Sequence, residues 1–180
     1  MTQEYTIKEK FDWNIYALEE NLNTLKKDLK IDQSQLNIVE NRNKKIYKNL
    51  SCVLHWIVYT DTYLYENSKS KKSDLYTLRK KKAGISNELH GIRYLYNYLK
   101  HQTTTFKVSK VDVTAVFDRP LFPDGYEIPV KFSSKMNENQ KNRIQQTFEL
   151  YVAHIQNQDI QDWVDKVLSF YKNIDISEIL

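Results

Sequence analysis

Apolar residues recur every three or four positions along three stretches of the chain, which is the spacing of one face of an α-helix. Over 11–29 the successive apolar residues lie 4, 3, 4, 3 and 4 positions apart. The stretch 33–66 continues the pattern, with Asn43 and Thr60 as polar members of an apolar seam. The third stretch, 85–101, follows a glycine at position 84. Each stretch predicts a helix.

The first two predicted helices are separated by very few residues. Asp32, with Gln35 three positions on, has the form of a capping box, so 30–32 is interpreted as a tight connection. Two long helices with such a short join are expected to pack as an antiparallel hairpin. The second helix would be about 50 Å long at 1.5 Å per residue.

The pattern changes in the second half of the chain. Over 105–133, apolar and polar residues first alternate and prolines then follow, which predicts a small β-like insertion. Asn137 with Gln140 predicts the capped start of another helix, and Asp159 the cap of a last one. We therefore expect an all-α fold, a bundle of four to five helices with a long antiparallel hairpin and a small β-like insertion.

Length and composition narrow the class of protein. The 180 residues suit one domain, 1–180, and only three glycines and three prolines argue against a β-sandwich or a collagen-like chain. Cys52 is the single cysteine, which excludes an intrachain disulfide and a cysteine-based zinc site. The spacing of His, Asp and Glu suggests no metal site, and no glycine-rich phosphate loop is present, so we expect no cofactor. Without a long apolar run or a secretory segment, the chain is expected to be cytoplasmic and not membrane-bound.

The positive charge is concentrated in one segment. The whole chain carries +4, but the window 69–82 carries +6, which leaves −2 for the rest. We interpret 68–83 as an exposed basic loop that contacts the phosphates of a nucleic acid, although such a run is also typical of ordinary solvated surface. The candidate binding residues are Lys69, Lys71, Lys72, Arg79, Lys80, Lys81 and Lys82.

The third predicted helix carries a polar flank beside its apolar stripe. Arg93, Asn97 and His101 are spaced i, i+4 and i+8, so that about 12 Å of helix separates the outer two, and His90 lies on the same flank. Arginine binds phosphate oxygens through a rigid fork, and histidine exchanges protons near neutral pH. Arg93, Asn97 and His101 are therefore candidate catalytic residues, with His90 as an accessory group. A hydrogen-bonding face between helices is the simpler interpretation of the same residues.

The sequence NELHGIRYLYNYLKHQ resembles the motif helix of HEPN domains, which are all-helical domains of many prokaryotic toxin, abortive-infection and RNA-processing proteins. Residues 97–101 match the Asn-x-x-Lys-His ending that many members carry, and Arg93 stands where an upstream arginine is expected. In the family, four to six residues separate the arginine from the histidine, whereas seven separate Arg93 from His101.

The resemblance implies a homodimer whose two motif helices face one another and cleave RNA without a metal ion. In that chemistry the ribose 2′-OH attacks the adjacent phosphate and leaves a cyclic phosphate and a free 5′-OH. His101 would be the general base or acid, Arg93 would stabilise the phosphate charge, Asn97 would orient the phosphate or the imidazole, and Lys100 would bind RNA. The resemblance also suggests a role in phage defence or a toxin–antitoxin system. The alternative is a non-catalytic dimeric helical module that binds nucleic acid or a protein partner through the same polar ridge.

Overall fold

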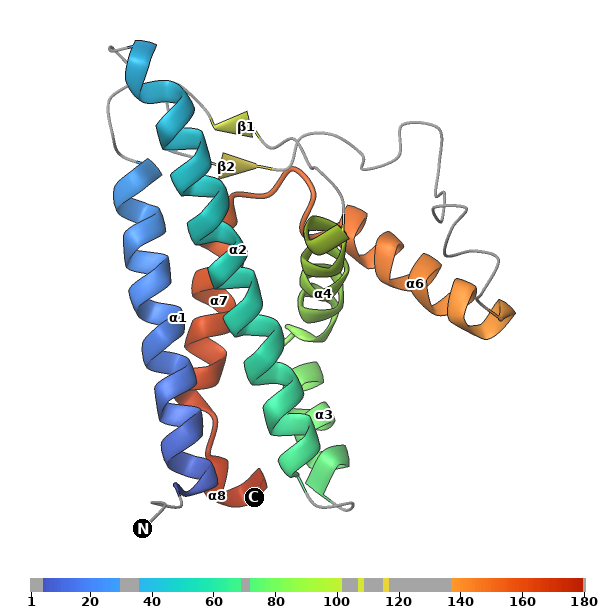
Figure 1. Cartoon of the computed structure of the whole chain (residues 1–180). Coiled ribbons are helices and arrows are strands. Elements are labelled where there is room, and N and C mark those ends of the chain that lie inside the picture. The colour runs from blue at the N-terminus through green and yellow to red at the C-terminus, as the bar shows by residue number, and fades with distance from the viewer. Residues whose placement is uncertain are drawn as a thin grey trace.

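The computed structural model describes residues 5–29, 36–68, 72–101, 107–108, 115–116 and 137–179. Within these ranges it describes the backbone alone at 36–43, 72–73, 100–101 and both strands. The helices are α1 (Ile7–Leu29), α2 (Leu36–Asn67), α3 (Lys72–Lys82), α4 (Ser86–His101), α6 (Glu138–His154), α7 (Ile160–Asn173) and α8 (Ile176–Ile179) (Figure 1). The strands are β1 (Lys107–Val108) and β2 (Ala115–Val116).

The antiparallel hairpin predicted from the first two apolar stripes is present as α1 and α2, which run side by side in opposite directions (Figure 1). α7 lies behind both helices and closes the core. The stripe of α1 is buried throughout, as is the seam of α2 from Ile46 to Leu64 at its apolar positions. Thr60 is fully buried within that seam. The connection at 30–32 and its predicted capping box lie outside the described residues.

The interpretation of 68–83 as an exposed loop is wrong over 72–82, because these residues form α3. Two side chains one helical turn apart hold this helix against the bundle: Tyr76 is fully buried and Lys80 is 8% exposed. Asp74 in the first turn and the cations of the last turn also suit the helix dipole. The apolar pattern missed the helix because its main anchors are a tyrosine and a lysine.

The described part of the chain contains seven helices, and the expected four to five did not include α3 or the four-residue α8. The helix starts predicted near the C-terminus are confirmed. Asn137 and Gln140 form a reciprocal capping box at α6, and the Asp159 carboxylate accepts a hydrogen bond from the Gln161 amide at α7. Of the predicted insertion 105–133, only β1 and β2 are described, and they pair antiparallel over two residues each.

Close packing against α6 fixes the position of α4. A Cβ atom on Gly91 would lie 2.9 Å from Ile155 Cγ1 and 3.0 Å from Tyr151 Cα, so only glycine allows this approach. Another side of α4 contacts α2, and the flank between these two contacts is open. Among the described residues, no helix is both long and apolar enough to cross a membrane.

Candidate functional site

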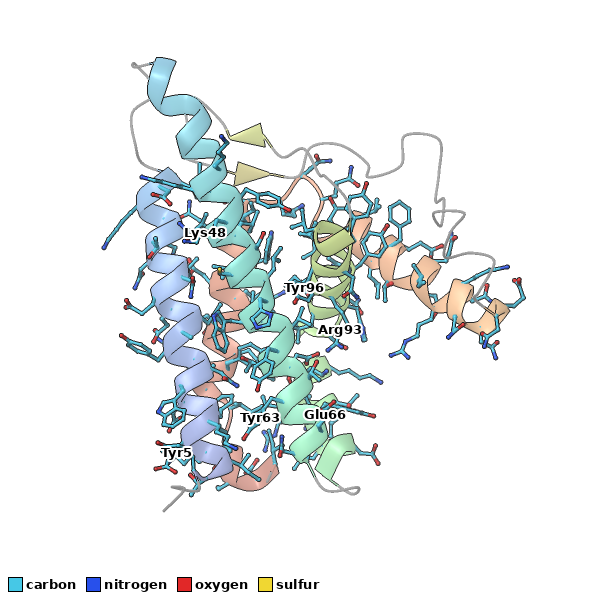
Figure 2. All side chains as sticks on the ribbon, viewed as in Figure 1. Tyr5, Lys48, Tyr63, Glu66, Arg93 and Tyr96 are labelled. Atoms are coloured by element: carbon cyan, nitrogen blue, oxygen red, sulfur yellow. The ribbon has the colours of Figure 1, made fainter. Side chains whose placement is uncertain are left out.

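The open flank of α4 presents the polar residues that the sequence placed there. His90 and Asn97 are exposed, and Arg93 is half-buried at the side facing α2 (Figure 2). His101 is the last residue of α4 and Lys100 precedes it, but their side chains are not among those described. We refer to His90, Arg93, Asn97 and the helical position of His101 as the α4 flank.

Arg93 is fixed in place by α2. Its Nη2 donates to Asp61 Oδ2 at 2.7 Å and to Thr62 Oγ1 at 3.1 Å. The other oxygen of Asp61 accepts hydrogen bonds from the Tyr76 hydroxyl at 2.8 Å and from Lys80 Nζ at 2.9 Å. The Lys80 ammonium also lies 4.6 Å from the centre of the Tyr76 ring. One buried carboxylate therefore joins α2, α3 and α4.

The charge balance of this network favours anions nearby. Burial raises the pKa of Asp61, but the adjacent cations Lys80 and Arg93, with hydrogen bonds from Lys80 and Tyr76, lower it further, so the net shift is downward. Asp61 is thus ionised at neutral pH. Its single negative charge faces two positive charges, which leaves an excess of one positive charge beside the α4 flank.

His90 lies in a cationic environment. Its pKa is lowered first by desolvation and then by Lys80, Arg93 and Arg143, and only Asp61 acts in the opposite direction. Arg143 belongs to α6 and is exposed, so the positive surface extends from α4 towards α6. The imidazole is therefore neutral at neutral pH, which is the form that a general base requires, although the cations disfavour its protonation.

The predicted basic segment does not form one continuous surface. Arg79 is paired with Glu178 of α8, and Lys80 is buried against Asp61, so these two cations serve the fold rather than an exposed basic loop. Lys81 and Lys82 are exposed. Lys69 and Lys71 lie outside the described residues, and Lys72 is described only by its backbone in α3.

The larger hollows on the surface of the described residues lie away from the α4 flank. One of about 600 Å³ is lined by α3, α7 and α8, including Lys82 and Lys166. The other, of about 690 Å³, lies between α1 and the C-terminal helices. Neither hollow is lined by a residue of the α4 flank, so that flank is an open surface rather than part of these two hollows.

Sequence reasoning missed Asp61, Thr62 and Arg143. Asp61 had a visible signal: it follows Ile57 by four positions, so it falls on the buried side of α2, where an ionised side chain needs a cationic partner. No signal in the sequence indicates the role of Arg143, because its proximity to His90 depends on how α6 packs against α4.

Among the described residues, no group of three or more His, Cys, Asp or Glu side chains is arranged to hold a metal ion. Comparisons of the chain with protein-family models, with curated proteins and with solved structures gave no match.

Proposed function

We propose that this protein binds RNA across the α4 flank and, as in the HEPN domains that it resembles, cleaves the RNA without a metal ion. The observation that carries the proposal is the excess of positive charge around an accessible flank. Lys80, Arg93 and Arg143 lower the pKa of His90, and Asp61 is the carboxylate that opposes them. Phosphate groups bind such surfaces by displacing counterions.

Arg93 is suited to phosphate binding even though Asp61 holds it. A guanidinium has five N–H donors, and the hydrogen bonds to Asp61 and Thr62 both come from Nη2. The donors on Nε and Nη1 have no partner among the described residues. Asp61 thus orients the fork, and the remaining donors are proposed to bind a phosphate oxygen.

In the proposed cleavage, His101 transfers the proton of the attacking 2′-OH or of the leaving 5′-oxygen, and Arg93 stabilises the charge on the phosphate. Asn97, exposed one turn before His101, orients the phosphate or the imidazole. The exposed cations Lys81 and Lys82 and the predicted Lys100 extend the contact to neighbouring phosphates. A homodimer, a cytoplasmic location and a role in phage defence or a toxin–antitoxin system belong to the proposal through the resemblance alone.

A non-catalytic interaction module is the second candidate, and the bond between Arg93 and Asp61 favours it. A guanidinium paired with a buried carboxylate stabilises the contact between two helices without any chemistry. In that case the α4 flank would hold a second copy of the chain or another protein.

Incubation of the purified protein with end-labelled single-stranded RNA in EDTA, at several salt concentrations, tests the proposal. We expect fragments that end in a cyclic phosphate and a 5′-hydroxyl. His101→Ala should abolish cleavage while its circular dichroism spectrum is unchanged. Absence of both binding and cleavage at low salt would refute the proposal. The interaction module predicts instead that Arg93→Ala changes the oligomeric mass and that no nuclease activity exists.

A further inference from the structure

Five aromatic rings form a continuous row on the surface of α2 and α4. We call this row the aromatic stripe; it comprises His55, Trp56, Tyr59 and Tyr63 of α2 and Tyr96 of α4. The ring of Tyr59 is stacked with His55 at 5.9 Å and with Tyr63 at 6.3 Å between ring centres. Trp56 lies edge-on to both His55 and Tyr59, and Tyr96 lies 5.9 Å from His55.

The stripe is exposed at His55 and Tyr59 and half-buried at its other three rings, and its rings are held in place. Tyr59 is 46% exposed, and His55 is also exposed. His55 Nδ1 is 3.0 Å from the Tyr96 hydroxyl, and the Tyr63 hydroxyl donates to the Ile7 carbonyl oxygen at 3.2 Å. The two ends of the stripe are thus tied to α4 and α1. Because these rings are already held in place, stacking of a ligand on them would cost little side-chain entropy.

The surface of α2 is positively charged before the stripe, and an exposed carboxylate, Glu66, follows its last ring by one turn. Lys44, Lys45 and Lys48 are exposed on α2 before the first ring. Between Lys44 and Tyr65 the only acidic residue is Asp61, which is buried and paired. Figure 2 shows Lys48 and Tyr63 along α2, with Tyr96 of α4 between them in height. The end of the stripe nearest these lysines, where His55 and Tyr59 are exposed, is therefore complementary to a polyanion with flat, stackable groups.

The stripe also adjoins the α4 flank. Tyr96 is next to Asn97 in the chain and one turn beyond Arg93, and it contacts His55 of the stripe directly. A ligand bound at Arg93 and Asn97 therefore reaches the rings of α2 across Tyr96.

We propose that the aromatic stripe binds unpaired nucleotides of RNA, whose bases stack on Tyr59 and its neighbours while lysines of α2 bind the phosphates. This inference rests on the proposed function, because it names the class of RNA that the α4 flank takes. Base faces are available for stacking only in single strands, so the stripe selects single-stranded RNA over duplex RNA.

Fluorescence anisotropy with an oligouridine octamer and with a duplex of the same length tests this inference. Tyr59→Leu removes the stacking ring, and Tyr59→Phe keeps it. Tyr65→Leu is the matched control, because Tyr65 is 55% exposed on the same helix but lies about 120° around it from Tyr59. Both positions are exposed, and thermal unfolding verifies that each of the three variants folds.

We expect Tyr59→Leu to weaken octamer binding about tenfold, with Tyr59→Phe and Tyr65→Leu within about twofold of the wild type. An octamer with abasic sites should bind the wild type as weakly as the normal octamer binds Tyr59→Leu. Equal octamer binding by Tyr59→Leu and the wild type would refute base stacking on the aromatic stripe and leave RNA binding at the α4 flank intact. A change of oligomeric mass in Tyr59→Leu, without any change in RNA affinity, would assign the stripe to self-association and also overturn the inference. Absence of RNA binding by the wild type would refute the proposed function together with the inference.

Discussion

Arg93 on α4 and Asp61 on α2 are joined by a 2.7 Å hydrogen bond between Nη2 and Oδ2, and the same carboxylate binds Lys80 of α3 through its other oxygen. The bond connects the polar flank of α4 to the interior of the bundle. It explains how an arginine beside an apolar stripe is held in one orientation. It also explains why a lysine of the most basic segment is buried.

Asp61→Ala should be strongly destabilising. The substitution leaves Lys80 buried without a counter-charge and removes the acceptor of the Tyr76 hydroxyl, which together cost about 3–5 kcal/mol. Urea unfolding measures the loss. Asp165→Ala, which breaks the exposed pair with Lys26, is the matched control and should cost less than about 1 kcal/mol. Similar losses for the two variants would contradict a structural role for the Asp61 network.

Stability should fall in acid partly through Asp61. Its pKa is lower in the folded state than in the unfolded state, so its contribution is complete above the unfolded value of about 4. That contribution is lost as the pH falls through the folded pKa. The difference in free energy of unfolding between wild type and Asp61→Asn should therefore be largest at pH 5 and above and shrink towards pH 2. A difference that stays constant over this range would show that the charge of Asp61 is not what stabilises the fold.

His90 should titrate below the ordinary histidine value of about 6.5, because desolvation and then the neighbouring cations disfavour its protonation. NMR titration of its ring protons measures the midpoint. Arg143→Ala should raise that midpoint, and so should added salt, which screens the cations. Lys10→Ala, which removes an exposed charge of α1, should leave it unchanged. A midpoint above 6.5 would contradict the cationic environment.

Gly91→Ala should destabilise the contact between α4 and α6 by about 1–3 kcal/mol, although alanine favours helices more than glycine does. The added methyl group meets the backbone of α6 at Tyr151, which cannot move away as a flexible side chain would. Thermal unfolding compares it with Asn97→Ala, an exposed change on the same helix that should stay within about 0.5 kcal/mol. A stabilised Gly91→Ala protein would mean that the two helices are further apart in solution.

Much of the fold was predictable because it depends on local patterns. The apolar spacing over Phe11–Leu29 and its continuation in α2 predicted the hairpin, and the caps at Asn137 and Asp159 predicted two helix starts. These patterns depend only on residues that lie within one or two helical turns of each other in the sequence. The helix α3 was not predicted, since its burial depends on Asp61, fifteen residues before Tyr76 in the chain.

The site was predictable only in part, because it also depends on contacts between residues that are distant in the sequence. The helical spacing placed His90, Arg93 and Asn97 on one flank, and the structure keeps them there. Charge counting assigned Arg79 and Lys80 to an exposed surface, but each has a carboxylate partner from another helix. Partners that are distant in sequence decide whether a cation is available to a ligand, and no local pattern contains them.

The salt dependence of RNA affinity in two charge-matched variants tests the central claim most directly. Arg143→Ala removes an exposed charge beside His90, and Lys10→Ala removes one from α1. If RNA crosses the α4 flank, Arg143→Ala should weaken single-stranded RNA binding and reduce the slope of log affinity against log salt by about 0.7, the value for one phosphate contact. Lys10→Ala should retain the wild-type slope. Equal slopes for the two variants, or an affinity that does not depend on salt, would contradict RNA binding at the α4 flank.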